Sequence, residues 1–175
     1  MSFVRIKTIK GHPYAYLVEN FWTGESSRQK VSQYLGKVLE FPCVSSAPAP
    51  NMTGLYAECL DELIIWQFTR MGFARKGNTL VKGKTCFDVL KRGFYRKDKQ
   101  ANTVIKNGEG YICASTLKEL YEFHEHGEDS QIGLALAKTI VNSGIEVPKE
   151  LFVALFEKAM ATKRRSRKLA EEIAT

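Results

Sequence analysis

Hydrophobic and polar positions alternate with the two-residue period of a β-strand over the first 36 residues. The alternation predicts three strands, over residues 3–10, 14–22 and 27–35. Aromatic and β-branched residues are dense in the first two strands, as half-buried pleated surfaces favour. Gly36 closes the third strand, so we expect residues 1–40 to form a small three-stranded antiparallel β module.

After residue 52 the hydrophobic spacing becomes three to four residues, which is typical of amphipathic helices. The pattern predicts helices starting near residues 53, 85, 115, 130 and 148. It also predicts two short hairpins, over residues 73–84 and 104–114. Past Ala161 the apolar stripe of the last predicted helix ends, and the sequence predicts a basic helical tail.

The segment between these two parts is rich in proline, which removes backbone donors and favours extended chain. The predicted organisation is a β module over 1–40, a linker over 41–51, a mainly helical domain over 52–161 and a basic helical tail over 162–175. The predicted fold class is therefore α+β: a small three-stranded antiparallel N-terminal sheet plus a mainly helical domain with short β-hairpins.

Composition excludes several classes of protein. The 175 residues, 44% hydrophobic and 26% charged, are typical of a globular chain rather than a disordered or collagen-like one. We expect no membrane partner, because no apolar run approaches the roughly 18–20 residues of a membrane helix. The first residues have no apolar signal region. The four cysteines include no C-x-x-C pair, so the chain is predicted to be cytoplasmic with reduced thiols and no metal or cofactor.

Charge is concentrated in blocks along the chain. The net charge is +7, but residues 70–106 alone carry 11 basic and 2 acidic side chains, and residues 107–157 carry 3 and 9. Blocked charge creates a local potential that favours an anionic partner. The alternative is that basic and acidic blocks fold against one another and neutralise.

Basic and aromatic side chains also combine in the predicted N-terminal sheet. Alternation places Arg5 and Lys7 on one face of the first strand, and Arg28 and Lys30 on one face of the third. The middle strand carries Tyr14, Tyr16 and Trp22 on one face, and Ala15, Leu17 and Phe21 on the other. Such a sheet can bind nucleic acid, since cations neutralise phosphates while rings stack on bases. Alternatively, the cations only solubilise the sheet while the aromatic rings pack inward.

Two local motifs have the residue types of a phosphate-binding loop and of a metal site, but not the spacing that these sites require. Lys82-Gly83-Lys84-Thr85 matches the last residues of the phosphate-binding loop motif G-x-x-x-x-G-K-[ST]. The upstream glycine, Gly77, is one residue further from Gly83 than this motif requires. His124 and His126 would point about 200° apart on a helix, so they cannot share one metal ion. No catalytic or metal-ligating residue is predicted.

The segment Tyr14-Ala-Tyr-Leu-Val-Glu-Asn20, with Trp22 and Gly24, leads to Arg28-Gln-Lys-Val31 and Tyr34-Leu-Gly-Lys37. This pattern resembles the amino-terminal segment of DDE-class insertion-sequence transposases, over about 37 of the 175 residues. The resemblance implies a small module associated with proteins that act on DNA. It does not extend to a transposase catalytic core, so it implies DNA contact and no transposase chemistry.

We therefore expect a non-catalytic nucleic-acid-binding protein, with DNA favoured over RNA, of a regulatory or mobile-element-related kind. The candidate binding residues are Arg5, Lys7, Arg28, Lys30, Arg70, Arg75, Lys76, Lys82, Lys84, Lys91, Arg92, Arg96, Lys97, Lys99, Lys163, Arg164, Arg165, Arg167 and Lys168. One alternative is a regulatory or structural subunit that docks an acidic protein or a ribonucleoprotein assembly. Another is an enzyme whose site forms only on folding, for example where Cys113, Glu122 and His124 converge.

Overall fold

Five strands form a mixed sheet that links the N-terminal segment to the rest of the protein. The computed structural model describes residues 2–24, 26–97, 102–124 and 127–173, with the backbone alone for 162–173. The strands are β1 (Ser2–Ile9), β2 (His12–Trp22), β3 (Ser27–Glu40), β8 (Thr103–Asn107) and β9 (Gly110–Ile112), in the order β1-β2-β3-β8-β9. All neighbours are antiparallel except β3 and β8, which run parallel.

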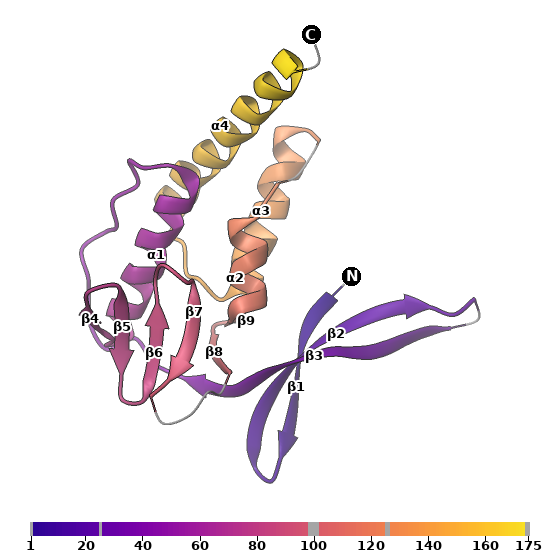
Figure 1. Ribbon diagram of the computed structural model, residues 1–175, viewed down its shortest axis with the longest axis vertical. Helices are drawn as coiled ribbons and strands as arrows, with labels where there is room; N and C mark the ends of the chain where they lie inside the picture. Colours follow the sequence, from indigo (N-terminus) through magenta and orange to yellow (C-terminus); the bar gives the residue numbers. More distant parts are fainter. Residues whose placement is uncertain (1, 25, 98–101, 125–126, 174–175) are drawn as a thin grey trace.

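A second sheet is a four-stranded antiparallel meander. Its strands are β4 (Ala74–Lys76), β5 (Thr79–Lys82), β6 (Thr85–Asp88) and β7 (Gly93–Arg96). The described helices are α1 (Tyr56–Arg70), α2 (Ala114–Tyr121), α3 (Asp129–Ser143) and α4 (Lys149–Ile173). Figure 1 shows the meander at the lower end of α1, with α4 above that helix and α2 and α3 to its right.

The main core is built around α1. The helix begins where the Glu58 carboxylate accepts a hydrogen bond from the Leu55 backbone N–H at 2.7 Å. Its inner face is fully buried, and Phe68 contacts Phe73 and Phe87 with ring centroids 4.9 and 5.1 Å apart. These aromatic contacts join α1 to the meander, while Leu60 and Leu63 lie in the same core as residues of α2, α3 and α4.

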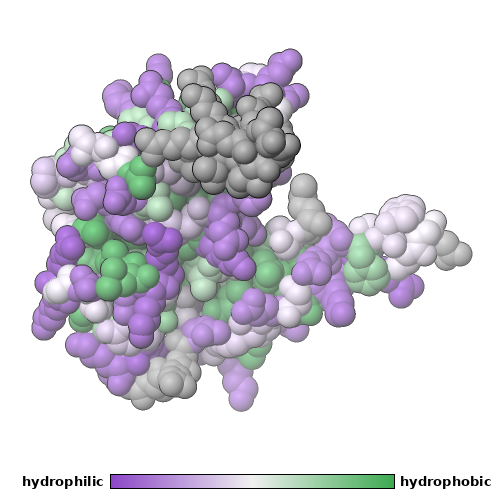
Figure 2. Space-filling view, turned by 45° about the horizontal axis from the view of Figure 1, so that its top comes forward, coloured by the Kyte–Doolittle hydropathy of each residue, from purple (hydrophilic) through white to green (hydrophobic). Residues whose placement is uncertain are grey.

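The β1–β2 and β2–β3 hairpins project from this body as an arm, which we define as residues 2–37 (Figures 1 and 2). A second, smaller core anchors the arm. In it, Ala15 of β2 and Val38 of β3 pack with Val104 of β8 and Cys113, which precedes α2. The body therefore holds the base of the arm, while much of its length lies against solvent.

The predicted architecture is wrong. The chain contains both helices and strands, but the N-terminal sheet has five strands rather than three, and four further strands form a sheet of their own in the described residues. The third strand does not end at Gly36, because this glycine adopts a φ of +129° and the chain continues in extended form to Glu40. Residues 85–93, predicted as a helix, instead form β6 and begin β7, with Phe87 packed on Phe68.

The segment predicted as a linker follows the surface of α1. The backbone N–H groups of Val44 and Ser45 donate to the Arg70 carbonyl at 2.8 and 3.3 Å, and the Trp66 indole donates to the Ala47 carbonyl at 3.3 Å. The division of the chain into domains stays a prediction. In the part of the chain that the structure describes, no helix is both long and apolar enough to cross a bilayer.

Candidate nucleic-acid interface

Basic and aromatic residues meet on one face of the arm. In an antiparallel sheet, residues directly opposite each other point to the same face. The register places Lys7 and Lys37 on either side of Tyr14, and Arg5 and Tyr34 on either side of Tyr16. These two neighbouring rows define a surface that we call the arm face: Arg5, Lys7, Tyr14, Tyr16, Tyr34 and Lys37.

The three tyrosines of the arm face form a contiguous aromatic cluster. The Tyr34 ring centroid lies 6.3 Å from that of Tyr14 and 5.4 Å from that of Tyr16, with interplanar angles of 43° and 53°. Tyr34 is 46% exposed, and Tyr14 and Tyr16 are half-buried. Partial burial raises the pKa of Tyr34, with a further contribution from its two neighbours. The Tyr34 ring is therefore neutral at physiological pH and presents an open π-surface.

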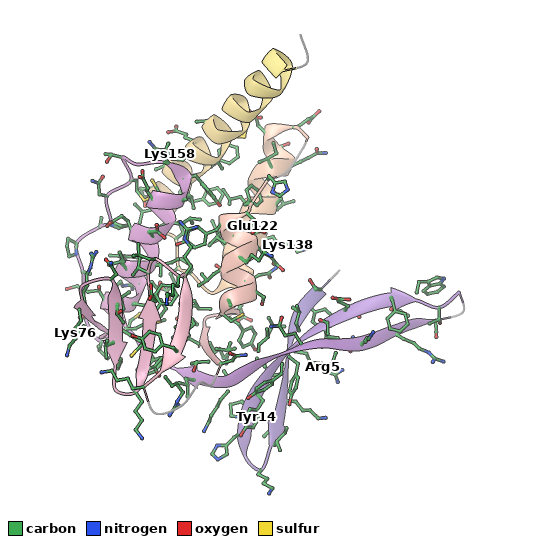
Figure 3. The ribbon with its side chains drawn as sticks, in the orientation of Figure 1. Arg5, Tyr14, Lys76, Glu122, Lys138 and Lys158 are labelled. Atoms are coloured by element: carbon green, nitrogen blue, oxygen red, sulfur yellow. The ribbon has the colours of Figure 1, made fainter. Side chains whose placement is uncertain are left out.

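The cations of the arm face are accessible. Arg5 and Lys7 are exposed, and Lys37 is half-buried. The Arg5 guanidinium donates one hydrogen bond to the Gln29 side-chain oxygen at 2.8 Å, which leaves most of its five N–H donors available. Among the residues that the structure describes, no carboxylate pairs with Lys7 or Lys37. The arm face thus presents three positive charges beside three rings (Figure 3, Arg5 and Tyr14 labelled).

The opposite face of the arm provides the anchoring contacts. Val4, Ile6 and Leu17 alternate with the residues of the arm face and pack with Tyr111 and the smaller core. Because these apolar residues point toward the body, the arm face points away from it. The half-buried Tyr14 and Tyr16 rings therefore lie on the face of β2 opposite the smaller core.

One irregularity in β3 brings Tyr34 and Lys37 to the same face. The register shifts between Ala15 and Tyr16, where β3 contributes the extra residue Leu35, and shifts again two residues later. Simple alternation would place residues 34 and 37 on opposite faces, but a β-bulge changes this parity. Glycine inside a strand often marks a bulge, so Gly36 is the residue from which this bulge could have been predicted. In the structure Gly36 adopts a φ of +129°.

Arg28 and Lys30 lie on the other side of the sheet. Arg28 is paired with Phe21, and Lys30 is paired with Glu19. Phe21 and Glu19 alternate with Tyr14 and Tyr16 along β2, so Arg28 and Lys30 lie on the face opposite the arm face. Both are exposed on the outer part of the β2–β3 hairpin. The structure therefore brings Arg5 and Lys7 together with the tyrosines and separates Arg28 and Lys30 from them.

Several cations of the 70–106 block bind groups within the protein, among them Lys106, whose ammonium lies 3.5 Å from a Glu40 carboxylate oxygen. The Arg70 guanidinium binds Glu146 at 2.9 Å and lies 4.5 Å above the Trp66 ring. The Lys82 ammonium donates to the Met71 carbonyl at 2.5 Å.

Arg92 is held in a similar way. Its Nε lies 3.4 Å from an Asp61 oxygen, and its guanidinium lies 3.7 Å from the centroid of the Tyr121 ring. The Tyr121 hydroxyl also donates to Asp61. Burial, with the neighbouring Asp61 carboxylate, raises the pKa of Tyr121. This cluster joins α1, α2 and the turn before β7, so the cation serves the fold.

The other cations of the block lie mainly on the surface of the meander. Arg75, Lys76, Lys84, Lys91 and Lys97 are exposed, and Arg96 is half-buried. Lys76 lies on the side of the body away from the arm (Figure 3). Lys99 lies outside the described residues, as do the side chains of Lys163, Arg164, Arg165, Arg167 and Lys168 on α4. The binding role of all these residues stays a prediction.

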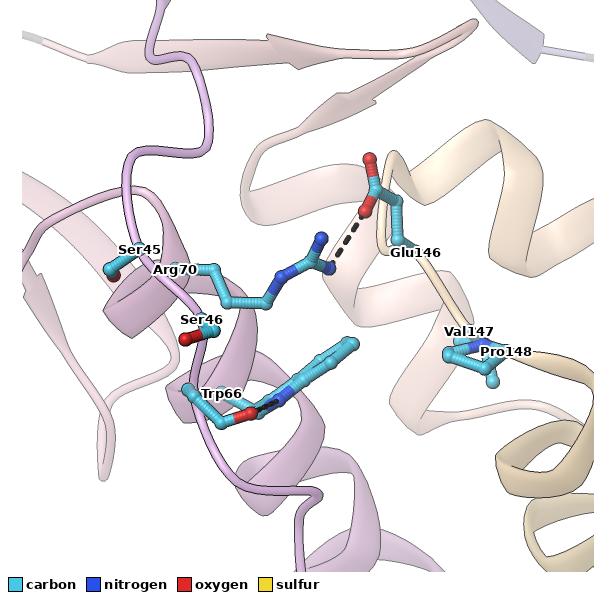
Figure 4. Close-up of a pocket in the computed structure, with 8 residues that line it drawn as sticks. Ser45, Ser46, Trp66, Arg70, Glu146, Val147 and Pro148 are labelled. Carbon is cyan, nitrogen blue, oxygen red and sulfur yellow. Dashed lines mark hydrogen bonds and ion pairs between the residues drawn. The ribbon is translucent and has the colours of Figure 1, made fainter.

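One open pocket of about 660 Å³ lies between α1 and the start of α4 (Figure 4). Its lining includes Ser45, Trp66, Arg70, Glu146 and Pro148. The charged groups satisfy each other, since Arg70 and Glu146 form an ion pair, and the Ser45 hydroxyl donates to the Thr69 carbonyl at 3.1 Å. The pocket therefore offers shape and an apolar wall but no activated nucleophile or base.

The residues that could have converged into an enzyme site do not meet. Cys113 is buried immediately before α2, where its sulfur lies 3.2 Å from the Ser115 hydroxyl. His124 is exposed beyond the other end of that helix and contacts the Glu122 backbone carbonyl. Within the described residues, the four cysteines are free, and no group of three or more His, Cys, Asp and Glu side chains could hold a metal ion.

Comparison with known proteins adds no assignment. No family model matches the chain, and neither a search of curated proteins nor a search of solved structures finds a significant match.

Proposed function

We propose that this protein binds nucleic acid without catalysing a reaction, that DNA is favoured over RNA, and that the arm face is the main contact surface. The observation that carries the proposal is the arrangement of three cations around three tyrosine rings on a sheet face that points away from the body. Cations bind the phosphate backbone, and exposed rings contact bases or sugars. The resemblance of residues 14–37 to the amino-terminal segment of DDE-class transposases supports DNA as the ligand.

The exposed cations of the meander supply a second source of positive potential. Arg75, Lys76 and Lys97 lie on the surface and add to the long-range attraction of a polyanion. Contacts of these cations to phosphates would be electrostatic and independent of base identity. The four free thiols are consistent with action in a reducing compartment, so we place the protein in the cytoplasm.

Fluorescence anisotropy of the full chain against labelled duplex DNA, single-stranded DNA and RNA of equal length tests this proposal. We expect affinity to fall steeply as salt is raised. The triple variant Arg5→Gln, Lys7→Gln, Lys37→Gln should bind weakly, whereas the double variant Arg28→Gln, Lys30→Gln on the opposite face should bind nearly as well as wild type. Affinity that is independent of salt, or equal in the triple variant and wild type, would refute the proposal.

A second candidate function, docking of a protein partner, is favoured by the end of the β2–β3 hairpin. Trp22 is 70% exposed and Phe21 45% exposed, and exposed aromatic rings are enriched at protein interfaces. The partner could be an acidic protein or a ribonucleoprotein assembly. A photoreactive amino acid in place of Trp22 would form a covalent adduct with a polypeptide in cells if this candidate holds. Adducts with nucleic acid alone would contradict it.

A further inference from the structure

We propose that the arm face selects single-stranded nucleic acid over duplex, by stacking bases on Tyr14, Tyr16 and Tyr34. This inference rests on the proposed function and specifies its substrate class. It commits to single-stranded DNA, because DNA is the ligand that the proposed function favours. The rings and the cations give separate arguments for this substrate.

The first argument is the position of the rings. Tyr14 and Tyr16 are two residues apart on β2, so their side chains leave the sheet about 6–7 Å apart on the same face. Tyr34 stands beside both, with centroid distances of 6.3 and 5.4 Å. A surface of this kind can receive two or three successive bases, as sheet-based single-strand readers do. In duplex DNA the base faces are covered by their neighbours, so the same rings can reach only edges and sugars.

The second argument is the position of the cations relative to the rings. Lys7 and Arg5 form a row on β1 along one side of Tyr14 and Tyr16, and Lys37 lies on the other side of Tyr14. A single strand can place its phosphates along the β1 row while its bases cover the rings on β2 and β3. The cations and rings then act on the same nucleotides, which is the combination used by single-strand binding surfaces.

The test compares a single strand with a duplex, using a labelled oligothymidylate and a mixed-sequence strand, each about 15 nucleotides long, and the mixed-sequence duplex. An RNA strand of the same length shows whether the sugar matters. We expect the wild-type chain to bind the single strands at least about tenfold more tightly than the duplex at equal salt. Base–aromatic stacking corresponds to roughly 5- to 150-fold in affinity per ring.

Tyr34→Leu is the informative variant, because Tyr34 is exposed and its loss leaves the smaller core intact. Phe21→Leu is its matched control, since Phe21 is 45% exposed against 46% for Tyr34 but lies on the opposite face. We expect Tyr34→Leu to lower single-strand affinity at least about fivefold and duplex affinity less than twofold. We expect Phe21→Leu to change neither, and Tyr34→Phe to restore single-strand binding.

A photocross-linking measurement gives a readout that does not depend on affinity. A single strand carrying 5-bromodeoxyuridine should cross-link on irradiation to Tyr14, Tyr16 or Tyr34, as mapped by mass spectrometry of the peptides. Equal affinity for duplex and single strand, with no loss in Tyr34→Leu, would overturn this inference and leave the proposed function standing. Absence of binding to every nucleic acid at low salt would overturn both.

Discussion

Replacing Lys7 by Gln should weaken the salt dependence of binding by the amount expected for one phosphate contact. Lys7 is exposed beside Tyr14, and no carboxylate pairs with it among the described residues. For a single strand, each neutralised phosphate contributes about −0.7 to the slope of log K against log salt. The arm face has three cations, so it accounts for a slope of about −2 in the wild-type chain and about −1.4 in the variant.

These slopes correspond to losses of affinity that anisotropy resolves easily. Raising the salt from 50 to 200 mM should weaken the contribution of the arm face about 20-fold in wild type and about 7-fold in Lys7→Gln. Stability should change by less than about 0.5 kcal/mol, because the position is exposed. Cations of the meander can add to the total slope but do not alter the difference between the two proteins.

Two variants serve as comparisons for Lys7→Gln. Arg70→Gln should leave the slope unchanged, because the Arg70 guanidinium is already paired with Glu146 at 2.9 Å. Lys76→Gln, on the meander, measures the contribution of that surface. If Lys7→Gln keeps the wild-type slope while Lys76→Gln lowers it, the meander is the interface, and the assignment of binding to the arm face is wrong.

Two further predictions concern stability. Gly36→Ala should lower the free energy of unfolding by at least about 2 kcal/mol, because its Cβ would lie 2.2 Å from a backbone carbonyl oxygen. Gly24→Ala, also at positive φ but in open space, should cost about 1 kcal/mol, and thermal unfolding followed by circular dichroism separates the two. Because burial raises the pKa of Tyr121, the unfolded state releases this proton first, and stability should fall as pH rises above about 10. Tyr121→Phe should reduce that fall in urea unfolding, and an unchanged pH dependence would contradict the assignment.

Periodicity was sufficient to predict the elements whose burial is one-sided. The alternation over β1 and β2 and the apolar stripes of α1 and α3 correspond to faces that pack on a core. The helix predicted to start near residue 130 is α3, which ends at Gly144 in the left-handed conformation of a helix C-cap. Each of these signals is local in the sequence.

The parts that were missed depend on contacts between distant residues. Thr85-Cys-Phe-Asp88 is four residues long, too short for periodicity to distinguish a strand from a helix, and its pairing with β5 and β7 decides the outcome. Net charge per block did not show that Arg70 meets Glu146 or that Arg92 meets Asp61. The same limit applies to the arm face, whose membership depends on a bulge in β3.

The parallel pairing of β3 with β8 has a consequence for the order of folding. Lys37 pairs with Thr103, so the arm joins the body only after the chain between these strands, including α1 and the meander, has been made and brought into place. Closing so long a loop costs chain entropy before any contact repays it, and non-local pairing of this kind slows folding. During synthesis, Val38 and Leu39 of β3 have no strand to pair with on this edge until β8 has been made. That edge is the segment where premature strand pairing between nascent chains would begin.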